Sequence, residues 1–64
     1  MVNIRCIAPL DEFKREVWPD KCFEVPRKGD YVKSKSGRVL TIHSITHCYD
    51  VVQHEYYVCV ILTK

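Results

Sequence analysis

Residues 25–46 read VPRKGDYVKSKSGRVLTIHSIT, and this stretch decides the fold. Pro26 and Gly29 are placed for a β-turn, because proline fixes φ early in a turn and glycine accepts a positive φ late in it. Gly37 supplies the positive φ that a second tight turn needs, between two runs of strand-forming residues. The stretch therefore predicts a β-hairpin, which defines architecture and specifies no chemistry.

Extended segments are also expected on either side of this hairpin. The first alternates apolar and polar residues, as a half-buried strand does, and β-branched residues dominate the longest one. The last is apolar on both faces, so either it runs through the middle of a curled sheet beside the N-terminal segment, or its second face docks onto a partner. The predicted strands are residues 2–8, 22–25, 30–34, 38–49 and 56–63, with a bend near Ser44 and a connecting loop at 50–55.

A short helix is possible only before Pro19. Asp11 is placed to cap one or two helical turns through Val17, although an irregular loop fits the same residues. The predicted fold class is therefore mainly β. We expect a small barrel or curled antiparallel sheet of four to five strands, with at most one short helix near residues 11–18, in a single domain of residues 1–64.

The size of the chain limits its stability. The 64 residues are 47% hydrophobic, which argues against disorder and leaves room for one domain. A domain of this length buries only about 60% of the surface that its unfolded chain exposes. Small domains often gain stability by self-association, so a homodimer is an expectation.

Charge is balanced overall and uneven along the chain. The formal net charge is +2, too small to indicate a nucleic-acid-binding protein by itself. Residues 11–24 are rich in acidic side chains, whereas residues 27–38 carry five basic side chains against Asp30. Such a mixed surface commonly serves solubility, and a phosphate-facing patch is the alternative.

The cysteines bear on the cellular compartment. The first residues show no signal peptide, and no apolar run approaches the roughly 18 residues of a membrane-spanning helix. We therefore expect a cytoplasmic protein, with no membrane association, whose four cysteines stay reduced. A disulfide framework is the alternative for this many cysteines in a short chain.

The segment Val25–Val32 resembles the Pro-x-x-Gly-Asp-x-Val opening of small SH3-like β-barrels, and the similarity continues to His47. The whole chain resembles the short uncharacterised proteins of this type that bacteria and their phages encode. The matching motif specifies backbone turns, so the resemblance implies a fold and no function. Peptide-binding SH3 domains have an acidic loop and paired tyrosines in a groove. The matching hairpin is basic here, and Tyr56 and Tyr57 lie in a terminal strand, so binding of proline-rich peptides is not implied.

Possible metal ligands cluster in the C-terminal third, but their spacing is unfavourable. Zinc sites usually take ligands as closely spaced pairs, and no such pair occurs among His43, His47, Cys48, His54 and Cys59. Adjacent residues of a strand, such as His47 and Cys48, face opposite sides. Cysteine–histidine catalysis needs a pocket that a barrel this small rarely encloses. We therefore predict no metal, no cofactor and no enzymatic activity.

Two kinds of binding surface remain. The preferred hypothesis is a non-enzymatic module that binds another protein of unknown identity, through an aromatic and apolar patch. Its predicted contact residues are Tyr49, Tyr56, Tyr57 and Ile61, with Trp18. The alternative is a small nucleic-acid-binding barrel that uses the basic hairpin. Its predicted contact residues are Arg27, Lys28, Tyr31, Lys33, Lys35 and Arg38.

Overall fold

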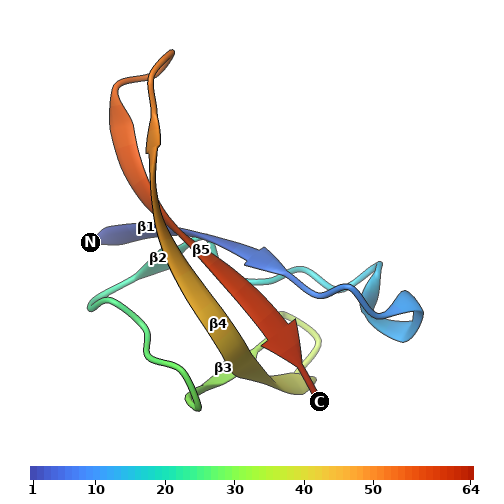
Figure 1. Ribbon diagram of the computed structural model, residues 1–64. Coiled ribbons are helices and arrows are strands. Elements are labelled where there is room, and N and C mark those ends of the chain that lie inside the picture. The colour runs from blue at the N-terminus through green and yellow to red at the C-terminus, as the bar shows by residue number, and fades with distance from the viewer.

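The computed structural model describes residues 1–64 and contains one five-stranded sheet. The strands are β1 (Val2–Ile7), β2 (Lys21–Cys22), β3 (Tyr31–Lys33), β4 (Val39–Asp50) and β5 (Glu55–Thr63). Their order in space is β2-β1-β5-β4-β3, and the sheet curls into a half-barrel (Figure 1). The predicted fold class, a small and mainly β curled sheet, is confirmed.

The last strand, β5, is the central strand of the sheet. It pairs in parallel with β1, where Ile4 lies opposite Val58, and antiparallel with β4 over most of its length. Of the two arrangements expected for the doubly apolar strand, the structure has the first, in which the strand runs through the middle beside the N-terminal segment. The sheet is mixed rather than antiparallel throughout, because the first and last strands run in the same direction.

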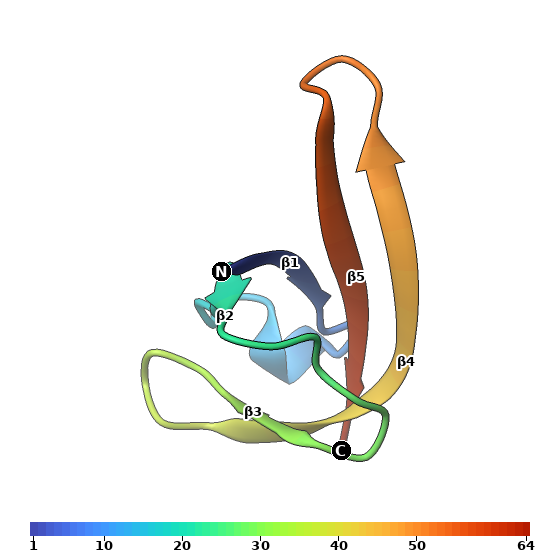
Figure 2. The ribbon, with the colours of Figure 1, turned by 90° about the vertical axis from the view of Figure 1, so that its left-hand side faces the viewer.

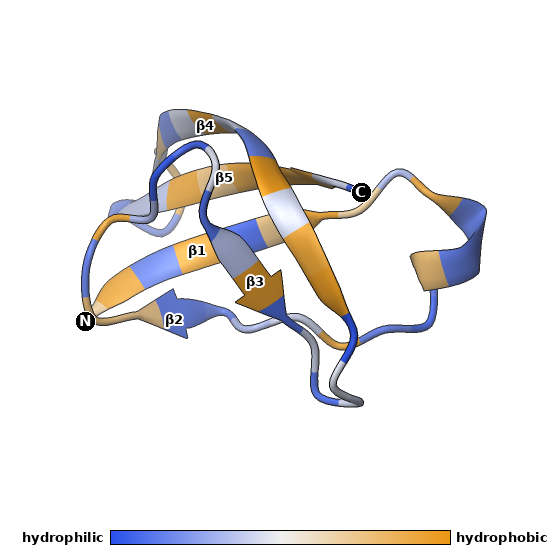
Figure 3. Cartoon of the chain, turned by 90° about the horizontal axis from the view of Figure 1, so that it is seen from below, coloured by the Kyte–Doolittle hydropathy of each residue, from blue (hydrophilic) through white to orange (hydrophobic).

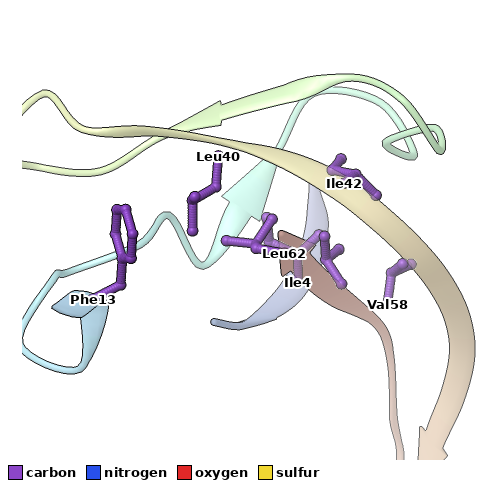
Figure 4. Packing of buried hydrophobic residues seen from close by; sticks show 7 residues of the cluster. Ile4, Phe13, Leu40, Ile42, Val58 and Leu62 are labelled. Atoms are coloured by element: carbon purple, nitrogen blue, oxygen red, sulfur yellow. The ribbon is translucent and has the colours of Figure 1, made fainter. Parts of the chain in front are cut away.

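The core lies on the concave side of the curled sheet. Its buried side chains converge from β1, β4, β5 and the segment before β2 (Figure 4), and they are Ile4, Phe13, Leu40, Ile42, Val58, Val60 and Leu62. Leu40 and Ile42 share this face, as their spacing predicts. In Figure 3 the hydrophobic stretches run along the three inner strands, which matches their central position.

A β-bulge divides β4 into two parts. The register shifts between Ile42 and Ser44, which lie opposite the neighbouring residues Leu62 and Ile61, so His43 is the extra residue. A bulge bends its strand and increases its twist, and this confirms the bend predicted near Ser44. Beyond the bulge β4 and β5 continue side by side, and past Val58, where the pairing with β1 ends, they project as a two-stranded ribbon (Figure 2). Residues 43–57 are here called the hairpin arm.

The segment before β2 differs from its prediction. Its only helical element is a single 3-10 turn, η1 (Asp11–Phe13). The expected capping by Asp11 is wrong: Leu10 occupies the N-cap without a side-chain hydrogen bond, and the Asp11 carboxylate lies 3.1 Å from the Lys14 ammonium. The structure contains no helix with the length and apolar character needed to cross a membrane.

The second predicted strand is also shorter than expected. β2 pairs only with Val2 and Asn3 of β1, so the ladder ends at Cys22. Phe23 and Val25 lie beyond it, in the loop that leads to β3, and their side chains are exposed. The sheet is therefore open between its two edge strands, β2 and β3.

Candidate protein-binding surface

Two tyrosines form a pair on the hairpin arm. Tyr49 and Tyr56 are directly opposite in the β4–β5 ladder, with ring centroids 4.7 Å apart and planes tilted by 52°. Because side chains alternate along a strand, Tyr56 lies on the same side of the sheet as the buried Val58. The pair thus continues the concave face beyond the core, and there Tyr49 is 45% and Tyr56 77% exposed.

Further exposed apolar side chains lie at the two ends of the hairpin arm. Val51 and Val52, in the turn of the arm, are 72% and 89% exposed. At the base of the arm, a cleft of about 340 Å³ is lined mostly by apolar residues, among them Met1, Val25 and Tyr56. Exposed apolar groups that gather in one place are typical of interaction surfaces.

Tyr57 lies on the opposite, convex face of the sheet, where β1 partly covers it. The Arg5 guanidinium lies 4.0 Å from the centroid of the Tyr57 ring, and it also lies 3.8 Å from the Asp50 carboxylate. A hydrogen bond with the neighbouring Cys48 thiol raises the pKa of the Tyr57 hydroxyl, with the charge of that thiol and burial adding to the effect. The ring of Tyr57 is therefore already in contact with another side chain of the chain.

The remaining predicted contact residues lie elsewhere. Ile61 is opposite Ile7 of β1 on the convex face, where it is partly buried. Trp18 packs against the core, with its ring centroid 6.2 Å from that of Phe13. The structure thus brings Tyr49 and Tyr56 together and separates them from Tyr57, Ile61 and Trp18. Sequence reasoning missed Val51 and Val52, although two adjacent valines in a predicted turn are a signal for exposed apolar surface.

The five basic residues predicted to bind nucleic acid differ in whether they already have a partner within the chain. Arg38 is engaged within the chain: its Nη1 donates to the Glu12 carbonyl at 2.8 Å. The other four, which are Arg27, Lys28, Lys33 and Lys35, are exposed and have no ion-pair partner. They remain available to an anionic ligand.

A groove of about 500 Å³ occupies the opening between β2 and β3. Its lining includes three predicted residues, Arg27, Tyr31 and Lys33. It also contains Lys21 and Phe23, which sequence reasoning missed because residues 22–25 were expected to form a strand. Phe23 is 88% and Tyr31 77% exposed, while Glu24 and Asp30 offset part of the positive charge.

The histidines and cysteines are dispersed over the sheet. No group of three or more His, Cys, Asp or Glu side chains converges as a metal site would require. His43 is in the bulge, and His54, in the turn of the arm, has a φ of 52°. All four cysteines are free, and burial, together with the charges of Cys22 and Cys59, raises the pKa of the Cys6 thiol to about 11.

Comparison with known proteins gives no match to a family model, a curated protein or a solved structure. The resemblance to SH3-like proteins of bacteria and phages stays a prediction. Function is therefore inferred from the surfaces described above.

Proposed function

We propose that this chain is a non-enzymatic protein-binding module that acts in the cytoplasm and docks through its hairpin arm. The observation that carries this proposal is the Tyr49–Tyr56 pair, which extends the concave apolar face to a place where no element of the chain covers it. Burying apolar surface contributes about 25 cal/mol per Å², so covering this face favours association. The four free cysteines support a reducing compartment.

The arm also presents these side chains in a fixed geometry. The Asp50 carboxylate closes its turn, because Oδ1 accepts hydrogen bonds from the backbone N–H groups of Val52 at 2.9 Å and Gln53 at 3.2 Å. Tyrosines have few rotatable bonds and offer a large contact area, so they lose little entropy when a partner covers them. The resemblance to phage-encoded proteins fits a module that occupies the surface of a host protein.

Site-specific photo-cross-linking tests the proposal. A photoreactive phenylalanine analogue replaces Tyr56 in one protein and Lys28, far along the chain and also exposed, in a control. In extracts of the cells that make the protein, we expect a discrete cross-linked species from position 56 only. Unlabelled native protein should compete with its formation, and a Tyr49→Ala/Tyr56→Ala double variant should not. Equal cross-linking at both positions, or equal competition by the double variant, would refute docking through the arm.

A second candidate function rests on the groove between β2 and β3. Proteins that bind single-stranded nucleic acid combine basic side chains with aromatic rings on which bases stack. The groove places Phe23 and Tyr31 beside Lys21, Arg27 and Lys33. This supports single-stranded nucleic acid as the alternative ligand.

Charge reversal separates the two functions. Lys33→Glu changes a groove residue, and Lys28→Glu makes the same change outside the groove. If the groove binds nucleic acid, Lys33→Glu weakens binding of a labelled oligothymidine, which fluorescence anisotropy measures. The slope of the logarithm of the affinity against the logarithm of the salt concentration should also become smaller in magnitude by about 1. Equal affinities for the native chain and both variants would remove this candidate.

A further inference from the structure

One side of the hairpin arm is a strand edge without a partner. β3 pairs with β4 only at Val39–Thr41, and the backbone of Ile42 bonds to Gly29 and Asp30. From there to Asp50, β4 has β5 as its one ladder partner. Figure 2 shows no other segment beside the outer edge of this part of β4. Alternate backbone N–H and C=O groups over residues 43–50 therefore point away from the sheet without a strand to receive them.

This edge lacks the features that usually prevent strand pairing. Natural edge strands are commonly short, or carry lysine, proline or a bulge that blocks a further strand. Residues 43–50 read HSITHCYD and contain no lysine, arginine, proline or glycine. The bulge at His43 lies at the base of the arm, so the ladder above it is uninterrupted. The edge is thus suited to accept an additional strand.

The chain is more extended than a compact monomer of its mass. The accessible surface is 4937 Å², whereas a compact monomer of this 7.6 kDa mass is expected to expose about 4,300 Å². The radius of gyration is 11.6 Å, against about 10.7 Å expected for this length. The chain thus exposes about 600 Å² more than a compact monomer of its mass. The projecting arm accounts for the elongated outline of 33 × 21 × 17 Å.

The edge is also compatible with its own copy. Two identical strands can pair antiparallel about a two-fold axis, so that each contributes the same residues. With the axis at Thr46, Ile45 lies opposite His47 of the partner subunit, and Ser44 lies opposite Cys48 of the partner subunit. No charged side chain lies opposite one of like charge, because residues 43–49 contain no Lys, Arg, Asp or Glu and Asp50 follows the paired segment.

We propose that the free β4 edge of the hairpin arm pairs with the same edge of a second copy of this chain. The two β4 edges pair antiparallel over residues 43–49 and join the two sheets into one. This inference goes beyond the proposed function, since the contact runs along the β4 edge of the hairpin arm and is separate from the Tyr49–Tyr56 face. The small core of seven buried hydrophobic residues also favours association, because domains of this size gain stability in oligomers.

Sedimentation velocity on the full chain tests the pairing. Measurements from about 5 µM to about 500 µM cover the affinities expected of a modest interface. We expect a monomer–dimer equilibrium that Thr46→Lys weakens at least about tenfold, because it places like charges on facing strands. Val17→Lys adds the same charge at an exposed position outside the hairpin arm, and should leave the equilibrium unchanged. A native chain that stays monomeric at every concentration, or a dimer that Thr46→Lys leaves intact, would overturn the inference.

Hydrogen exchange on the native chain provides a test that needs no variant. Dimerisation through the edge should slow exchange of alternate amides within residues 43–49 as concentration rises, while the amides of β3, the other edge, stay unchanged. A dimer without this protection contradicts edge pairing. The two proposals can also fail separately. A strictly monomeric chain that still forms the competed cross-link from position 56 refutes the second copy as occupant and keeps docking through the arm.

Discussion

Arg38 lies over the ring of Phe13, with its guanidinium carbon 4.3 Å from the ring centroid. The same side chain donates a hydrogen bond from Nη1 to the carbonyl of Glu12 at 2.8 Å. Phe13 is a core residue, so Arg38 connects the segment before β4 to the 3-10 turn that closes one end of the half-barrel. Arg38, which the sequence places in a candidate nucleic-acid-binding patch, thus makes contacts that belong to the fold itself.

Replacement of Arg38 should therefore destabilise the fold. Arg38→Ala removes a cation–π contact and a charge-assisted hydrogen bond, and we expect a loss of about 1–2 kcal/mol in the free energy of unfolding. Urea denaturation measures it. Lys35→Ala removes a nearby exposed charge without such contacts, and its effect should stay within about 0.5 kcal/mol. Equal effects of the two variants would show that the contact with Phe13 contributes nothing.

Glu16 makes stability dependent on acidic pH. Its carboxylate accepts hydrogen bonds from the hydroxyls of Ser36 and Ser34, the latter at 2.7 Å. These bonds, that of Ser36 first, lower the pKa of Glu16 below its ordinary value of 4.5, and the charge of Arg38 acts in the same direction. Because the folded pKa is depressed, this stabilisation is present above the unfolded pKa and is lost as pH falls through the folded pKa.

The expected result is a urea midpoint that decreases as pH is lowered from about 6 to about 3. In Glu16→Gln the part of this decrease that belongs to Glu16 should disappear, since the amide does not titrate. Glu24→Gln is the matched control, and it should keep the native pH profile. If Glu16→Gln and the native chain have parallel profiles, the serine hydroxyls do not favour the ionised carboxylate.

Substitution of Leu62 tests how much the small core contributes to the free energy of unfolding. Its side chain is 1% exposed and belongs to the core cluster, where Leu62 lies opposite Ile42 of β4. Leu→Ala in such positions costs about 2–5 kcal/mol, a large share of the roughly 3–10 kcal/mol expected for a domain of this size. We expect Leu62→Ala to be largely unfolded by circular dichroism at 25 °C. Val52→Ala, at an exposed position, should retain the native unfolding midpoint.

Local patterns in the sequence predict much of the fold. Gly29 and Gly37 have φ values of 93° and 97°, which is the left-handed geometry expected of the two turns. Strand alternation correctly places Leu40 and Ile42 on one face. The helix is shorter than its signals indicate because isolated short helices are marginal, and contacts of Phe13 with distant residues decide its conformation. The parallel pairing of β1 with β5 depends on residues far apart in the chain, and no local pattern specifies it.

The candidate surface is harder to predict from the sequence than the fold is, because it too depends on pairing between residues far apart in the chain. Alternation separates Tyr56 from Tyr57, but the cover that Arg5 gives to Tyr57 depends on the register between β1 and β5. The free edge of β4 follows from the difference in length between β3 and β4, which sequence reasoning placed only approximately. Exposure of Phe23 depends on where the β1–β2 ladder ends. Each of these features requires the complete topology.

Asp50 stabilises the turn at the end of the hairpin arm through hydrogen bonds. Its Oδ1 accepts two backbone hydrogen bonds from the turn, and the turn also holds His54 at a φ of 52°, which is unfavourable for a residue with a side chain. Asp50→Ala removes both bonds, so we expect faster hydrogen exchange at Val52 and Gln53. Because the turn lies outside the core, the cost in global stability should be only about 1 kcal/mol.

Asp50→Asn is the matched variant, since its amide oxygen can still accept from the two backbone N–H groups, and it should restore slow exchange at Val52 and Gln53. The asparagine lacks the charge that faces Arg5, so a comparison of the two variants separates the hydrogen bonds from the ion pair. If Asp50→Asn exchanges as fast as Asp50→Ala, the ion pair with Arg5 orders the turn instead. An ordered turn holds the two strands of the arm in register, so Asp50→Ala should also weaken any contact made along the β4 edge, whereas Asp50→Asn should preserve it.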